Sequence, residues 1–77
     1  MDTDLETFLR NIAWLRESRG ISKRRMCRLL HIGVATLDTI ERCELPPQLT
    51  IDVAFYIYRE FHVPPAELFR RRLWEQR

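Results

Sequence analysis

Residues 20–43 read GISKRRMCRLLHIGVATLDTIERC, and this stretch decides the fold. Ser22 is a good helix N-cap, because its hydroxyl can accept a hydrogen bond from a free backbone N–H of the first turn. Apolar residues then recur at helical spacing on both sides of a break: Met26, Leu29 and Leu30 before it, Leu37 and Ile40 after it. The stretch therefore predicts two short helices, at about 23–30 and 34–42.

The break between these two helices is the tripeptide His31-Ile32-Gly33. Three residues leave room only for a sharp corner, and Gly33 can adopt backbone angles that other residues avoid. Two helices of about two turns each bury little surface alone, so both must dock on a larger body. This is the arrangement that a helix-turn-helix motif requires.

Three further helices are expected around this pair. The sequence Thr3-Asp4-Leu5-Glu6 fits a capping box, which predicts a helix at about 4–18 that stops at Gly20. Thr50 is the expected N-cap of a helix at about 51–61, and Pro64-Pro65 starts the last helix. The fold class is therefore all-α, with five helices.

The faces of these helices that should point inward follow from helical spacing. They comprise Leu5, Phe8, Leu9, Ile12 and Leu15 in the first helix, Ile51, Ala54, Phe55, Tyr58 and Phe61 in the fourth, and Leu68, Phe69 and Leu73 near the end. Trp14 lies on the opposite side of the first helix, where it either forms a contact surface or packs against the C-terminal tail. We expect one domain over residues 1–77, with a core of about 5–73 and a basic tail at 70–77.

Length and composition exclude several classes of protein. Seventy-seven residues make one domain near the lower size limit for unaided folding. No apolar run approaches the ~20 residues of a membrane span, and the acidic start MDTDLETF argues against a secretory signal. Cys27 and Cys43 form neither a disulfide framework nor a zinc-spaced cluster, which favours a cytoplasmic protein without cofactor, metal or small-molecule ligand. His31 and His62 show no acid-oriented arrangement with a thiol, so no enzymatic activity is expected.

The positive charge is unevenly placed although the net charge is only +2. Residues 16–28 hold six cations against Glu17 alone, and residues 70–77 hold four arginines against Glu75. Such clusters predict a surface that faces a polyanion, with a solvated face as the alternative. The cations at 23–25 lie at the positive end of the helix dipole, which lowers the stability of the helix. A phosphate bound there would make the same charges stabilising.

Core residues recur in one particular order between about residues 9 and 69. They are Ile12, Leu15 and Arg16, then Ile21-Ser22, Met26, Leu30 and Ile32, then Leu37, Ile40 and Glu41, and finally Val63, Leu68 and Phe69. Their joint order and spacing resembles the Cro/phage-repressor family, also called XRE-type. The resemblance implies a five-helix lambda-repressor-like domain with the helix-turn-helix at helices two and three.

The resemblance also implies roles for individual residues. Arg16 would form a structural ion pair with Glu41, and Lys23 would contact the DNA backbone. Residues at the front and outer face of the second motif helix would read bases in the major groove. These are Val34, Ala35, Thr36 and Thr39, with Asp38 and Arg42 nearby.

Several positions depart from the family pattern. Gly33 stands where a Ser or Thr cap is usual, and His31 and Cys43 stand where the family often has Gly. Val34 and Ala35 offer no hydrogen bonds, so they could contact only thymine methyl groups. A left-handed backbone at His31 or Cys43 would cost about 1 kcal/mol each.

Two functions compete on these grounds. The first is a sequence-specific transcriptional regulator that binds double-stranded DNA, with Ser22, Lys23, Arg24 and Arg25 on phosphate. One short half-site discriminates weakly, so a homodimer on a near-palindrome is expected. Surplus apolar residues are candidates for its interface: Trp14, Val53, Tyr56, Leu73 and Trp74.

The alternative is a protein-interaction module that keeps the fold without specific DNA reading. The apolar front of the second motif helix and the acidic connector that follows it favour this interpretation. DNA binding would place the cations of the first motif helix, the face of the second and the basic end of the chain on one side. Scattered cations beside one broad apolar patch would favour protein interaction.

Overall fold

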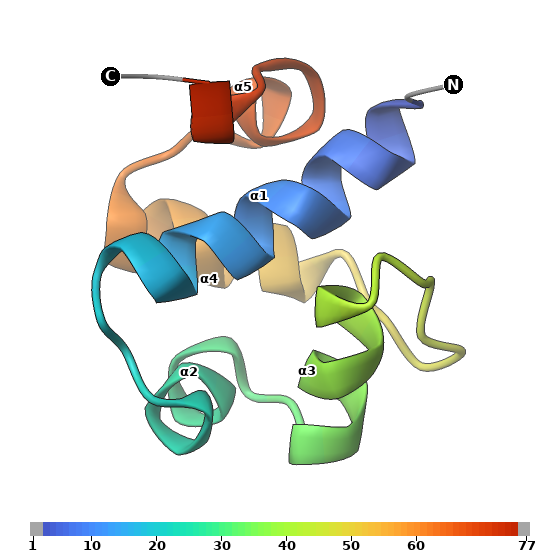
Figure 1. Ribbon diagram of the computed structural model, residues 1–77, viewed down its shortest axis with the longest axis vertical. Helices are drawn as coiled ribbons and strands as arrows, with labels where there is room; N and C mark the ends of the chain where they lie inside the picture. The colour runs from blue at the N-terminus through green and yellow to red at the C-terminus, as the bar shows by residue number, and fades with distance from the viewer. Residues whose placement is uncertain (1–2, 76–77) are drawn as a thin grey trace.

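Helices are the only regular secondary structure in residues 3–75, the part of the chain that the computed structural model describes (Figure 1). In chain order they are α1 (Asp4–Ser18), α2 (Lys23–Leu30), α3 (Val34–Glu41), α4 (Asp52–Phe61) and α5 (Pro65–Arg70), followed by a short 3-10 turn, η1 (Leu73–Glu75). No strand occurs between residues 3 and 75, which confirms the all-α class. The bounds predicted for α1 and α2 are confirmed, whereas α3 ends one residue earlier than expected.

Helix α1 is the scaffold on which the other elements are mounted. Its N-cap is Thr3, whose hydroxyl accepts a hydrogen bond of 3.1 Å from the backbone N–H of Glu6. Figure 1 shows α1 crossing the molecule in front of α4, with α5 on one side and α2 and α3 on the other. α1 packs against α3, α5 and η1. It ends before Gly20, which has a φ of 64°, a conformation that glycine adopts without strain.

The corner between α2 and α3 is sharp, as its three residues require. Ser22 caps α2, and its hydroxyl accepts a hydrogen bond of 3.1 Å from the N–H of Arg25. His31 ends the helix in the left-handed conformation, with a φ of 57°. Gly33 is the N-cap residue of α3, where no side chain makes a capping hydrogen bond. Cys43 also has a positive φ of 61°, so two positions where the family often has glycine are left-handed here.

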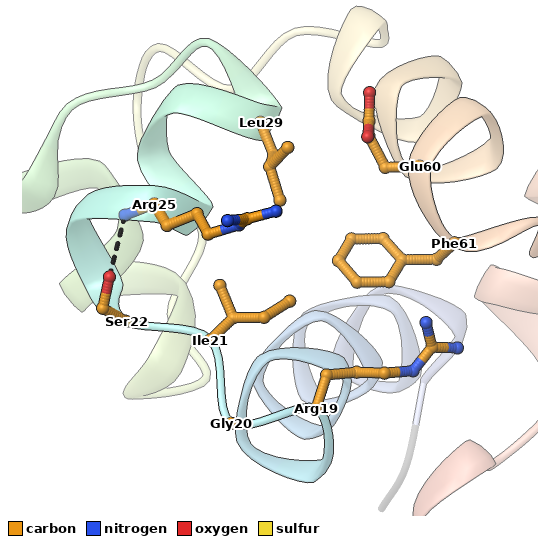
Figure 2. A pocket seen from close by; sticks show the side chains of 8 residues that line it. All are labelled: Arg19, Gly20, Ile21, Ser22, Arg25, Leu29, Glu60 and Phe61. Atoms are coloured by element: carbon orange, nitrogen blue, oxygen red, sulfur yellow. Dashed lines mark hydrogen bonds between the residues drawn. The ribbon is translucent and has the colours of Figure 1, made fainter.

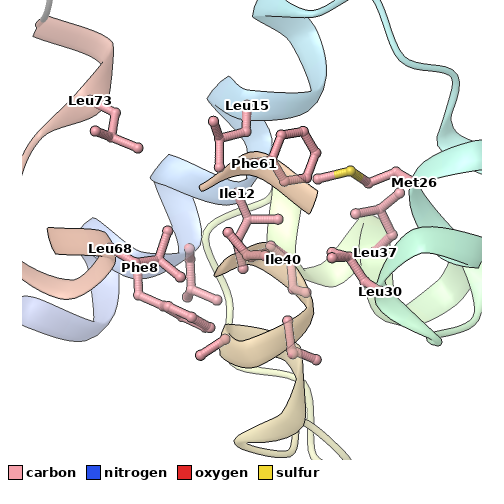
Figure 3. Packing of buried hydrophobic residues seen from close by; sticks show 14 of the residues in the cluster. Phe8, Ile12, Leu15, Met26, Leu30, Leu37, Ile40, Phe61, Leu68 and Leu73 are labelled. Carbon is pink, nitrogen blue, oxygen red and sulfur yellow. The ribbon is translucent and has the colours of Figure 1, made fainter. Parts of the chain in front are cut away.

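One apolar core joins all five helices (Figure 3). Its fully buried members include Leu9, Ile12 and Leu15 of α1, Met26 and Leu30 of α2, Leu37 and Ile40 of α3, Ile57 of α4 and Leu68 of α5. Cys27 is buried among them. Since α2 and α3 bury their few apolar residues here, their orientation depends on the other three helices.

Buried Asn11 connects α1 to the C-terminal segment, and the sequence pattern did not predict this. Its side-chain amide donates to the carbonyl oxygens of Leu68 and Arg71 at 2.7 and 2.8 Å. Its Oδ1 accepts from the N–H of Leu73 at 2.9 Å. Asn11 is 0% exposed, so these bonds satisfy both side-chain groups away from water. Residues 70–75 of the expected basic tail are therefore a docked segment.

The prediction for α4 is wrong in part: Ala54 and Phe61 face the core as expected, but the other three residues of the predicted face do not. The helix begins at Asp52, and no side chain caps it, so Thr50 is not its N-cap. Val53, Ala54, Ile57 and Phe61 face the core, whereas Ile51, Phe55 and Tyr58 are 74, 55 and 51% exposed. Both faces of this helix are apolar, so helical spacing alone could not choose between them. Packing against α2 and α5 selects the face with the smaller side chains.

Candidate nucleic-acid interface

The exposed surface of α2 carries positive charge, part of which no ion pair within residues 3–75 neutralises. Arg24, Arg25 and Arg28 are exposed and make no ion pair in that part of the chain. The first turn of α2 contains no acidic residue. Most other surface arginines differ, because glutamates near them in sequence form ion pairs with Arg42, Arg59, Arg71 and Arg72. The unpaired charge is thus concentrated on one short helix.

Lys23 does not point freely to solvent. Its Nζ lies 2.8 Å from Oδ1 of Asp38 in α3, and both side chains are partly exposed. This hydrogen bond lowers the pKa of the Asp38 carboxyl and raises the pKa of the Lys23 ammonium. Lys23, which was predicted to contact phosphate, and Asp38, which was predicted to lie near the bases, therefore form an ion pair that links α2 to α3. We call this pair the Lys23–Asp38 brace. The two residues lie 15 positions apart, and only the corner brings them together.

A second brace joins α3 to α1. Arg16 and Glu41 form a two-pronged ion pair, in which Nε donates to Oε2 and Nη2 donates to Oε1, the latter at 3.0 Å. Arg16 also donates from Nη1 to the carbonyl of Ile21 at 3.0 Å. The side chains are only 17 and 13% exposed, and the hydrogen bond with Glu41 raises the pKa of Arg16. The ion pair implied by the family resemblance is present.

The outer face of α3 combines methyl groups with few free polar groups. Val34 is 51% exposed and Ala35 is also exposed, whereas Thr36 and Thr39 are half-buried. The Thr39 hydroxyl donates to the Ala35 carbonyl at 2.9 Å. Arg42 follows α3, and its Nε lies 3.2 Å from Oε1 of Glu44 on the surface. A hollow of about 160 Å³ separates this face from Pro46 and Pro47 of the connector.

A larger pocket of about 580 Å³ lies between α2, the end of α1 and the end of α4 (Figure 2). Figure 2 shows the side chain of Arg25 extending from α2 toward α4, between the apolar side chains of Leu29 and Ile21. Arg19 lies 5.3 Å from the ring centroid of Phe61 on another wall. The pocket thus brings Arg19 and Arg25 together with the carboxylate of Glu60.

The C-terminal arginines do not extend that surface. Figure 1 shows α5 and η1 at the end of the molecule opposite α2 and α3. Arg71 pairs with Glu67, and Arg72 pairs with Glu75, each at 3.3 Å. The condition that the α2 cations, the α3 face and the basic end of the chain lie on one side is therefore not met, and only the α2 cations lie beside α3.

The structure contradicts part of the expected dimer interface. Val53 is buried because it lies on the face of α4 that packs against the core. Leu73 is buried because Asn11 holds the C-terminal segment against α1. Trp14 is half-buried and lines a pocket of about 380 Å³ with Trp74, so it packs against the C-terminal segment. Tyr56 stacks on His31, with ring centroids 4.2 Å apart. The five candidate residues therefore do not form one exposed surface.

The described residues contain no group of three or more His, Cys, Asp or Glu side chains that could hold a metal ion. Burial raises the pKa of the Cys27 thiol. No helix between residues 3 and 75 is long and apolar enough to cross a membrane.

Sequence reasoning missed two features of this surface. The Lys23–Asp38 brace had a signal in the opposite charges, but nothing in the sequence set their distance. The exposure of one apolar face of α4 could also have been anticipated. Val53 and Ile57 are as apolar as Phe55 and Tyr58, so the sequence shows that only one of two apolar faces can be buried. Comparison of the chain with protein-family models, with curated proteins and with solved structures finds no match in any of the three.

Proposed function

We propose that this protein is a sequence-specific DNA-binding transcriptional regulator of the XRE type. In this proposal α2, the corner and α3 form the helix-turn-helix of a lambda-repressor-like domain. α3 lies in the major groove, and the start of α2 lies on the DNA backbone. The observation that carries the proposal is the set of unpaired arginines on α2, next to an α3 that two ion pairs hold in place.

The charge argument is physical. Cations in the first turn of a helix oppose its dipole and lower stability unless an anion is nearby. A DNA phosphate accepts hydrogen bonds from the free N–H groups of the helix start and attracts Lys23, Arg24 and Arg25 together. Ser22 holds that first turn in a helical conformation. The arrangement is therefore unfavourable without a polyanion and favourable with one.

The residues of α3 determine which bases the protein can recognise. The methyl groups of Val34 and Ala35 suit the C5-methyl groups of thymine. Thr36 and Thr39 can hydrogen-bond base edges, and Arg42 can bind guanine once it leaves Glu44. Asp38 accepts from a cytosine amino group while Lys23 turns to phosphate. Because one such face reads few base pairs, two copies on a near-palindrome supply the specificity.

The test is selection of duplexes from a random library, followed by affinity measurements at several stated salt concentrations. We expect log Kd to change linearly with log salt concentration. Replacing Arg24, Arg25 and Arg28 together by Gln should reduce that slope by roughly 3 and weaken binding to all sequences. The matched control replaces Arg70, Arg71 and Arg72 by Gln at the opposite end. Equal losses in the two variants, or binding that ignores salt, would refute the proposal.

A protein-interaction module is the second candidate, and the exposure of Val34, Phe55 and Tyr58 favours it. It predicts that the selection returns no duplex above the level of random DNA. It also predicts that the α2 triple variant keeps its protein partner, because that binding would depend on apolar contact.

A further inference from the structure

The exposed face of α4 is the most apolar surface among the described residues that no part of residues 3–75 covers. Ile51, Phe55 and Tyr58 recur at the spacing of one helical face, and all are more than half exposed. We define these three residues as the α4 face. Large apolar side chains gathered on one surface mark a contact site more often than scattered ones do.

A groove lies beside the α4 face. It has a volume of about 190 Å³ and is lined mainly by Leu5 and Phe8 of α1, Ala54 of α4 and Phe69 of α5, with Ile51 at its edge. Phe8 and Phe69 stack with ring centroids 4.4 Å apart, which makes this wall rigid. A cavity of about 150 Å³ is enough to hold a benzene ring. The groove can therefore receive an aromatic side chain such as Tyr58.

Protruding side chains and a receiving groove on the same surface make that surface complementary to itself. The charges have the same property, because Asp52 precedes Phe55 by three residues and Arg59 follows it by four. When two such helices cross antiparallel at Phe55, Asp52 of each copy faces Arg59 of the other. Arg59 forms an exposed ion pair with its neighbour Glu60, at 3.0 Å, and lies 5.1 Å from the ring centroid of Tyr56. A surface ion pair of this kind rearranges at little cost.

We propose that the α4 face is an interface between two copies of this chain, related by a twofold axis near Phe55. The pairing is isologous, so each Phe55 faces Phe55 of the other copy and each Tyr58 lies over the groove beside the other α4. The three residues of the face expose roughly 400 Å² per copy, if a fully exposed aromatic side chain carries about 250 Å². Two copies then bury about 800 Å², an area typical of weak and transient interfaces. The dimer should form at micromolar to millimolar concentrations.

The experiment is sedimentation velocity on the protein alone, at concentrations from about 10 µM to about 1 mM, where a weak interface of this size associates. We expect the wild type to shift from the monomer mass toward twice that mass. Phe55→Lys should stay monomeric over the range. Leu45→Lys is the matched control, because Leu45 is also about half exposed, at 56%, but lies in the connector between α3 and α4. It should dimerise like the wild type, and thermal unfolding should show that both variants fold.

The charge pairing has its own test, which does not depend on the lysine variants. Asp52→Arg and Arg59→Asp should each weaken the dimer at least tenfold, and the double variant should restore it. A wild type that is monomeric throughout, or a Phe55→Lys variant that still dimerises, would overturn the proposal. So would assemblies larger than dimers, or a monomer that binds lipid vesicles through Phe55. No DNA is present, so the result is independent of the proposed function.

Discussion

At the scale of single residues, Asn11 shows how one buried amide can determine the path of a chain end. A helical stripe predicts an apolar residue at this position, and Ile12 beside it follows that rule. Asn11 instead satisfies two carbonyls and one N–H of the segment that follows α5. Removal of a buried partner leaves such groups unsatisfied, and this is more costly than the bond itself is stabilising.

We expect Asn11→Ala to lower the free energy of unfolding by about 2–3 kcal/mol. The melting temperature of a domain of this size should then fall by roughly 10–20 °C. Urea unfolding followed by far-UV circular dichroism measures the first quantity. An exposed substitution on the same helix, Glu17→Ala, is the control for helix α1. A loss below about 0.5 kcal/mol in Asn11→Ala would contradict the assigned role.

The two glycines make a second prediction at this scale. Gly33 has ordinary backbone angles and open space where a side chain would project, and it caps α3 without a side-chain hydrogen bond. Gly33→Ser should therefore stabilise the protein by about 0.5–1 kcal/mol through capping and a less flexible unfolded chain.

Gly20 is the matched control, because it has equally open space but a φ of +64°. Gly20→Ser should destabilise by about 1 kcal/mol, since a Cβ strains the left-handed conformation. The free energy of unfolding of both variants, measured in urea, tests this prediction. Shifts of the same sign would show that backbone geometry does not separate the two sites.

At the scale of elements, the two ion pairs decide how α3 is held. The Arg16–Glu41 pair is largely shielded from water, so removal of one partner leaves a poorly solvated charge. We expect Arg16→Met to destabilise by about 2–3 kcal/mol. The double variant Arg16→Met/Glu41→Leu should recover a large part of that loss, because no charge then remains unpaired. A double-mutant cycle in urea measures this coupling, and additive losses would argue against it.

The Lys23–Asp38 brace should give the stability a dependence on pH. The pKa of Asp38 lies below its ordinary value of 3.8 in the folded protein, so the unfolded chain binds the proton first. The contribution of the brace is therefore present above about pH 4 and is lost as the pH falls through the lowered pKa.

Unfolding free energies of the wild type and Asp38→Asn should differ near neutral pH and converge in acid. Lys23→Met should remove the same pH dependence, because it removes the cause of the shift. Parallel pH profiles for the wild type and both variants would exclude the brace as the source.

At the scale of the whole molecule, the C-terminal segment closes the core. A chain that ends at Arg70 loses the buried Leu73 and two of the three partners of Asn11. The combined cost is about 3–5 kcal/mol, which is a large share of the stability of so small a domain. We expect this truncated chain to be mostly unfolded by circular dichroism at room temperature. A chain that ends at Glu75 keeps these contacts and should unfold like the full chain.

Local sequence determined the helices themselves. Ser22 and Thr3 mark two starts, Gly20 marks a stop, and the corner at 31–33 is too short for any other connection. These signals act over a few residues through capping and backbone preference, so they can be read without the fold. The cation cluster on α2 was also evident, because it lies in one short stretch.

Only the tertiary structure decided which face of α4 is covered, where the C-terminal segment docks and which cations are paired. Phe55 and Ile57 are equally apolar, and packing against the rest of the core is what separates them. Lys23 meets Asp38 and Asn11 meets Leu73 across 15 and 62 positions. Such contacts depend on how the helices pack together, and no local pattern in the chain encodes that arrangement.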